Sequence, residues 1–194
     1  GRGSVSPLQL TLVGVAVGAL LGGIASGITL LFPDAFAQMR DWGAGTLSGR
    51  GWDIVGAVTP FILAAAVLSL AIAPSLNGSA LGDDLAESLG ARVLRTRILV
   101  ILAVTILSGA ATAAAGPIGF VGLMVPHICR WFVGPDQRWI LVFTLVVAPF
   151  LTTISDVVGR VIIAPQEVQV GIVTALLGAP ILVLLARRAK VSGL

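Results

Sequence analysis

The chain has 194 residues, of which 57% are hydrophobic and only 11% are charged, with a mean hydropathy of +1.04. Soluble domains carry roughly 25% charged residues, so this composition excludes a water-soluble globular fold and predicts a polytopic membrane protein. The net charge of +3 does not indicate a nucleic-acid partner, because the basic residues form no stripe with aromatic residues between them. Residues 1–194 are therefore expected to form one all-α transmembrane domain whose surroundings are membrane lipid.

Apolar runs in the first part of the chain predict two spanning helices, at 8–32 and 54–73. Residues 33–53 between them carry charges and two tryptophans, a composition that suits a membrane boundary. The segment 74–97 that follows is the most polar part of the chain. The start, 1–7, lacks an initiator methionine and resembles a linker or a truncation point.

An uncharged run of 32 residues, 98–129, is too long for one span and too short for two. At 1.5 Å per residue a single helix would be about 48 Å long, against a hydrocarbon core of roughly 30 Å. A Gly-Pro pair interrupts the run, so residues 115–119 predict a turn between one full helix and a short returning helix. Further spans are expected at 139–161 and 168–186, which brings the total to six.

The distribution of basic residues predicts how these spans are oriented. With the N-terminus in the cytoplasm, nine of the twelve lysines and arginines lie on the cytoplasmic side. The three on the outer side are Arg40, Arg50 and Arg160. This bias favours six spans with both ends of the chain in the cytoplasm.

Residues that could support catalysis or metal binding are scarce. His127 is the single histidine and is expected to hydrogen-bond to the backbone near a helix end, because no acidic or cysteine partner lies nearby in sequence. Cys129 is the single cysteine, which excludes an internal disulfide. Neither a Walker loop nor a G-x-S-x-G nucleophile motif occurs. We therefore expect no enzymatic activity, no metal and no cofactor in this chain.

Asp156 is an ionisable residue inside a predicted span, where a charge is costly and commonly functional. It precedes Arg160 by four residues, so the two side chains share a helical face and the simplest interpretation is an ion pair. An ion-coupled carrier would be expected to use several such groups. A secondary transporter is therefore the weaker alternative.

Small residues dominate 108–119, and glycines recur at positions 14, 18, 22 and 23 of the first predicted span. Small side chains allow helices to pack closely, or they leave a wide path between helices. The sequence leaves both interpretations open.

The segment 74–97 is predicted to be a cytoplasmic loop longer than a hairpin connection. Within it, residues 81–90 predict a short amphipathic helix, with Asp83 and Asp84 near its N-terminus and Gly90 at its end. Such a helix either docks a partner or lies on the lipid surface, and both interpretations stay open at this level.

Several segments resemble the permease subunits of bacterial ABC importers for iron-siderophores, haem and cobalamin, the FecCD-like and BtuC-like family. The most specific match begins at residue 116 and is similar to the family pattern GPIGFVGLxxPHxxR. The matching residues are Gly116, Pro117, Gly119, Phe120, Gly122, Pro126, His127 and Arg130. Segments 42–52 and 156–180 are similar to further family motifs, in the same order along the chain.

The resemblance implies which surfaces contact partners. The segment 81–90 is similar to the family's coupling segment, on which an ATP-binding subunit acts. The residues implied in that contact are Leu81, Gly82, Asp83, Asp84, Ala86, Leu89 and Gly90. Arg160 matches a position where the family presents an arginine to a carboxylate of an extracytoplasmic binding protein, a role that rivals the ion pair with Asp156.

The resemblance further implies an alternating-access permease of about ten spans, of which this sequence matches the last six. Two permease subunits, identical or paralogous, would enclose the pathway, and ATP would be bound by partner subunits only. We therefore expect the C-terminal part of an importer permease in the bacterial inner membrane, with an iron-siderophore as the leading substrate. Haem and cobalamin are the alternatives within the family. An ion-coupled transporter or a membrane-embedded enzyme would belong to a different class.

Overall fold

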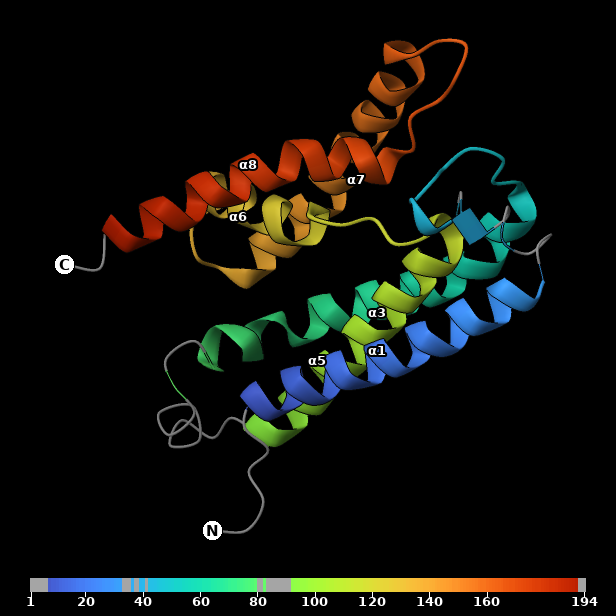
Figure 1. Ribbon diagram of the computed structural model, residues 1–194. Coiled ribbons are helices and arrows are strands. Elements are labelled where there is room, and N and C mark those ends of the chain that lie inside the picture. The colour runs from blue at the N-terminus through green and yellow to red at the C-terminus, as the bar shows by residue number, and fades with distance from the viewer. Residues whose placement is uncertain are drawn as a thin grey trace. The chain divides into compact units, whose positions relative to one another are not determined.

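The computed structural model describes residues 7–32, 36, 39–40, 42–79, 82 and 92–191. Six helices lie in these ranges (Figure 1): α1, Pro7–Leu31; α3, Trp52–Ser79; α5, Val93–Ala115; α6, Val121–Val133; α7, Gln137–Ile162; and α8, Val170–Val191. The predicted all-α fold is confirmed, including the short helix that follows the Gly-Pro break.

Four of these helices, α1, α3, α5 and α7, are long and apolar enough to cross a bilayer. The helix α6 and the apolar part of α8, Val170–Leu184, are shorter. Large apolar side chains remain exposed along the helices, as Leu63 at 60% and Val146 at 69% illustrate. Exposed apolar surface of this extent is unfavourable in water and is expected where lipid tails cover the protein.

The helices extend past the apolar runs that predict them. Contrary to the predicted end at Ala73, α3 continues through Pro74 to Ser79, and α5 begins at Val93 rather than at Ile98. Hydropathy marks only the apolar part of a helix, and its polar last turn stays helical outside the hydrocarbon. A proline removes one backbone donor, which membrane helices tolerate.

The loop predicted at 74–97 is thereby shortened to the residues between α3 and α5. The predicted coupling residues Leu81, Asp83, Asp84, Ala86, Leu89 and Gly90 lie outside the described residues. Gly82 is described and has a φ of 101°, in the left-handed region that favours glycine.

The chain divides into two compact units, Gly1–Asp41 and Trp42–Leu194. In the first unit, α1 is a continuous helix of 25 residues without a charged residue. Pro7 is its first residue, a position where the missing proline N–H has no intrahelical partner to lose.

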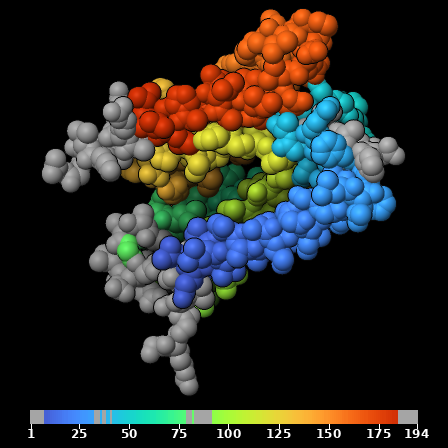
Figure 2. Space-filling view, in the orientation of Figure 1, coloured from blue at the N-terminus to red at the C-terminus, as the bar shows by residue number. Residues whose placement is uncertain are grey.

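In the second unit the helices form two groups. The helix α3 packs along α5, while α6, α7 and α8 pack on one another, and α3 also contacts α7 (Figure 1). Val125 and Cys129 of α6 form a buried core with Ile140 of α7. In the space-filling view, α8 (red) borders α6 (yellow) (Figure 2). This arrangement leaves α5 and α7 facing each other without direct packing along their lengths.

The connecting segments of the second unit gather at its two ends. At one end, residues 42–50 contact both the break at 115–120 and the α7–α8 connection, 163–169. At the other end, Asn77 of α3 contacts Asp136, just before α7. This grouping agrees with the predicted alternation of spans, while the end that faces the cytoplasm stays a prediction.

Candidate functional site

The helix α5 ends at a glycine, Gly116, which is its C-cap residue. Gly116 has a φ of 76°, and its N–H donates to the carbonyl oxygen of Thr112 at 2.8 Å, which closes the last turn. A Cβ on Gly116 would overlap the carbonyl oxygen of Trp42. Both the backbone dihedral and the available space therefore require glycine at the start of the break.

The helix after the break cannot cross a membrane alone. Its thirteen residues make α6 about 20 Å long at 1.5 Å per residue, against a hydrocarbon core of about 30 Å. In a chain that spans a membrane, irregular backbone such as that of 116–120 is tolerated where it is buried in protein or lines a cavity. Gly116, Ile118 and Val121 do line a cavity.

Phe120 fixes the start of α6 against α8. Its φ of 67° is unusual for a residue that carries a side chain. The side chain of Phe120 lies directly on the backbone of Gly178, where an added Cβ would overlap it. A backbone conformation this rarely populated is maintained only where the surrounding packing enforces it, as the contact with Gly178 does for Phe120.

Residues 42–48, which we call the crossing segment, pass between the break and the start of α8. The N–H of Thr46 donates to Ala115 O at 2.8 Å, and the N–H of Gly171 donates to Gly45 O at 3.1 Å. A side chain on Gly171 would overlap the carbonyl oxygen of Ala44. Backbone contacts on both sides therefore hold the crossing segment in place, and they carry Leu47 to the space between α5 and α7.

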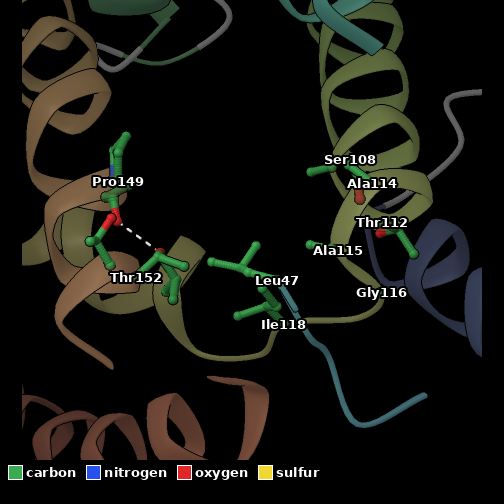
Figure 3. Close-up of a pocket in the computed structure, with 13 residues that line it drawn as sticks. Leu47, Ser108, Thr112, Ala114, Ala115, Gly116, Ile118, Pro149 and Thr152 are labelled. Atoms are coloured by element: carbon green, nitrogen blue, oxygen red, sulfur yellow. Dashed lines mark hydrogen bonds between the residues drawn. The ribbon is translucent and has the colours of Figure 1, made fainter. Parts of the chain in front are cut away.

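A cavity of about 540 Å³ lies between α5 and α7. It is lined by Leu47, Ser108, Ala111, Thr112, Ala114, Ala115, Gly116, Ile118, Val121, Ala148, Pro149, Thr152 and Thr153. In Figure 3, Ser108 projects from α5 and Thr152 lies on α7, with Leu47 and Ile118 between the two helices. The small residues of 108–116 thus serve both predicted purposes: most of them leave room for the cavity, and Gly116 allows close packing.

The cavity wall is apolar with a few hydroxyl groups. Among the described residues that line it, none is charged. The hydroxyl of Thr152 donates to Ala148 O at 2.8 Å within α7, so it is already satisfied (Figure 3). Ligand pockets commonly enclose roughly 300–1,000 Å³ and are mostly apolar with a few polar groups. The cavity has the size and surface of a binding space for an organic ligand.

A charged cluster lies at the end of α7 and in the connection that follows. Arg160 Nε lies 2.8 Å from Asp156 Oδ2, which confirms the predicted i,i+4 ion pair, and Arg160 Nη1 lies 3.8 Å from Glu167 Oε1. Ser48 donates its hydroxyl to the other carboxylate oxygen of Glu167. The Arg160 side chain is 44% exposed, and ion pairs this accessible contribute only about 0–1 kcal/mol. The arginine is therefore easily released to another partner.

At the opposite end of the unit, α3 is joined to α7 by a contact that we call the Asn77–Asp136 clasp. Asn77 Nδ2 donates to Asp136 Oδ1 at 2.8 Å, and Asn77 Oδ1 accepts from the N–H of Gln137 at 2.8 Å. Asp136 Oδ1 also accepts from the N–H of Arg138 at 2.9 Å, so Asp136 caps α7. The hydrogen bond from Asn77, followed by that from Arg138, holds the pKa of Asp136 below its usual 3.8.

The residues of the predicted family motif fall into two places. Gly116, Pro117, Gly119 and Phe120 form the break, whereas Gly122, Pro126, His127 and Arg130 lie on α6. His127 Nδ1 lies 2.8 Å from Leu123 O, which confirms the expected bond to the backbone. The docking role of Arg160 and the coupling role of 81–90 stay predictions.

Several residues that build this region have no predicted role. In the sequence, only similarity to a family motif points to the crossing segment. Of its two glycines, Gly45 has a positive φ, and a glycine at such a position can indicate a close approach of backbones. Asp136 between Pro135 and an apolar run is a recognisable N-cap. Asn77 and Glu167 carry no local signal, because their partners lie far away in sequence.

Comparisons with known proteins agree with this architecture. The sequence model of the FecCD transport family matches residues 1–188. The ferric enterobactin transport system permease protein FepD of Escherichia coli (strain K12) is 47% identical over 188 residues, which cover 97% of this chain and 56% of FepD. The hemin transport system permease protein HmuU of Yersinia pestis is 36% identical over 181 residues, covering 93% of this chain and 54% of HmuU.

A solved structure is similar as well. A metal-chelate type ABC transporter in an inward-facing conformation aligns with a TM-score of 0.87 at 27% identity, over 95% of this chain and 60% of that one. The chain thus spans somewhat more than half the length of these relatives. Because the family model covers nearly all of the sequence, the chain belongs to the FecCD transport family.

Proposed function

We propose that this chain forms part of the permease of an ATP-driven importer and that the cavity between α5 and α7 belongs to the substrate pathway. The observation that carries the proposal is an uncharged cavity of about 540 Å³, framed by a broken helix in a chain of the FecCD transport family. A broken helix with irregular backbone at membrane depth is a common way to build a path through a bundle.

The cavity lining favours a chelated metal over a bare ion. A hard cation such as Fe³⁺ prefers anionic oxygen ligands, and the described lining residues offer only hydroxyls, backbone and apolar groups. An organic chelator would carry its own ligands and present an apolar or hydrogen-bonding surface to the wall. An iron-siderophore is the substrate class we propose, and haem is the main competitor, since HmuU is named for hemin transport.

Partners follow from the same proposal. An ATP-binding subunit would contact the cytoplasmic segment 81–90, and a second permease subunit, identical or paralogous, would complete the pathway. An extracytoplasmic binding protein would dock at Arg160 and deliver the substrate. The assembly would lie in the bacterial inner membrane with both ends of this segment in the cytoplasm, and it would work by alternating access.

An ion-coupled secondary transporter is the alternative from another class. The described spanning helices contain two acidic residues, Asp53 in the first turn of α3 and Asp156 in α7. Asp156 is engaged with Arg160, which leaves it poorly suited to bind and release a coupling ion. ATP-driven transport is therefore the better-supported class.

The decisive experiment is uptake in a strain that lacks the transporter. We expect that restoring the assembled transporter recovers uptake of a ferric siderophore, and that a Walker-motif variant of its ATP-binding subunit abolishes it. Haem and cobalamin are offered separately under the same conditions. Recovery of haem uptake alone would replace the proposed substrate, and uptake that persists without ATP hydrolysis would overturn the proposed class.

Docking at Arg160 is tested by reversing its charge. Arg160→Glu places a third carboxylate beside Asp156 and Glu167, so we expect capture of the loaded binding protein to weaken about tenfold or more. The measurement is the Kd of the binding protein for the assembled transporter in nanodiscs. Glu167→Gln serves as the control, because it removes a competitor for Arg160 and should leave capture intact or stronger. An unchanged Kd for Arg160→Glu would contradict the docking role.

A further inference from the structure

The Asn77–Asp136 clasp connects two parts of the molecule that have different proposed roles. Asn77 lies four residues before Leu81, where the predicted coupling segment begins. Asp136 and Gln137 lie at the start of α7, the helix that supplies Ala148, Pro149, Thr152 and Thr153 to the cavity wall. The clasp thus links the end of α3 that leads to the coupling segment with the helix on the far side of the cavity.

The packing of the second unit shows how movement could pass through this link. The helix α3 packs along α5, which forms one wall of the cavity, while α7 packs with α6 and α8 and forms the other. At the end near the break, the backbone of the crossing segment joins the end of α5 to α8, which packs on α7. At the opposite end, the clasp is a polar contact between α3 and α7. A displacement of the end of α3 therefore reaches α7 through the clasp, which adds a directional polar contact to the direct packing of α3 on α7.

The chemistry of the clasp makes it a firm and specific link. Asn77 uses both ends of its amide on a single turn of α7, donating to Asp136 and accepting from the N–H of Gln137. The acceptor is a carboxylate, and hydrogen bonds to charged groups are roughly twice as strong as neutral ones. The lowered pKa of Asp136 means that the carboxylate stays ionised throughout the neutral range.

Building on the function proposed above, we infer that Asn77 is a positioning residue that passes movement of the coupling segment to α7 and thus to the cavity. Breaking the clasp would leave the ATP-binding subunit attached and hydrolysing ATP, while α7 would follow α3 less closely, through their packing alone. The expected signature is a loss of uptake per ATP hydrolysed, rather than a loss of protein or of basal hydrolysis.

An exchange of amide and carboxylate tests the inference. Asn77→Asp removes the donor and sets two carboxylates against each other, so we expect uptake per ATP to fall about tenfold. Asp136→Asn keeps every hydrogen bond and should have only a small effect. In the double variant, Asn77→Asp with Asp136→Asn, the new amide at position 136 can turn to donate to the new carboxylate. It then gives up the cap on the N–H of Arg138, because Asp136 Oδ1 serves both contacts in wild type, so uptake per ATP should recover in part.

The measurements are made on the assembled transporter in proteoliposomes, with uptake, basal and substrate-stimulated ATP hydrolysis, and the amount of folded complex recorded together. If Asn77→Asp does not accumulate, Asn77→Ser replaces it. The inference is overturned if the single variant keeps wild-type coupling, if uptake and hydrolysis fall in proportion to folded protein, or if the double variant gives no rescue. A wild-type complex that lacks ATP-dependent uptake overturns the proposed function itself and the inference with it.

Discussion

Gly116→Val is expected to destabilise the second unit strongly. A valine is strained at a φ of 76°, at a cost of about 1–3 kcal/mol, and its side chain would overlap the carbonyl oxygen of Trp42, which adds roughly 1–3 kcal/mol of overpacking. We expect the thermal midpoint of the detergent-solubilised permease to fall by about 10 °C or more. Uptake should fall with it, because the crossing segment loses its position beside Ala115.

Gly109→Val is the matched control for this prediction. Gly109 lies in α5, the helix that Gly116 caps, and an added Cβ there meets nothing within 4 Å. The same substitution should therefore leave the thermal midpoint nearly unchanged. Equal effects of the two variants would show that helix propensity, and not the close approach at the break, decides the outcome.

Filling the cavity is expected to block transport without unfolding the protein. Ala111 lies on the cavity wall of α5 with an exposed side chain, so Ala111→Phe places a ring in open space. We expect uptake to fall at least about tenfold, since even a misfit of about 1.4 kcal/mol in the pathway corresponds to that factor. Basal ATP hydrolysis and complex assembly should remain, and both are measured on the same proteoliposomes.

Ala113→Phe separates a blocked pathway from a general effect of a large side chain. Ala113 is also exposed on α5, two residues further along, and it does not line the cavity. Its variant should import substrate at nearly the wild-type rate. Comparable losses in the two variants would mean that the cavity is not the substrate pathway.

Features of the fold that depend on local sequence could be predicted well. Long apolar runs fix the positions of α1, α3 and α7, and the Gly-Pro pair at 116–117 fixes the break, because both signals act within a few residues. The i,i+4 spacing of Asp156 and Arg160 similarly specifies an ion pair on one helix. The ends of the helices are predicted less accurately, because hydropathy does not show where a polar turn stops being helical.

The site itself depends on contacts between distant residues, which a single sequence does not specify. Thr46 pairs with Ala115, and Asn77 pairs with Asp136, through bonds that bridge more than fifty positions. No periodicity or spacing in the sequence predicts such pairs. Leu47 reaches the cavity only because the crossing segment is held from both sides, so its place in the lining could not be read from its neighbours in sequence.

The crossing segment is held by main-chain atoms, and this has a consequence for redesign. The bonds from Thr46 to Ala115 and from Gly171 to Gly45 use only N–H and carbonyl groups, so they persist whatever side chain stands at position 47. The cavity surface at Leu47 and the backbone bonds that hold the segment thereby belong to neighbouring residues. A library varied at Leu47 and Ile118 would change the cavity surface while the backbone bonds of the crossing segment stay constant.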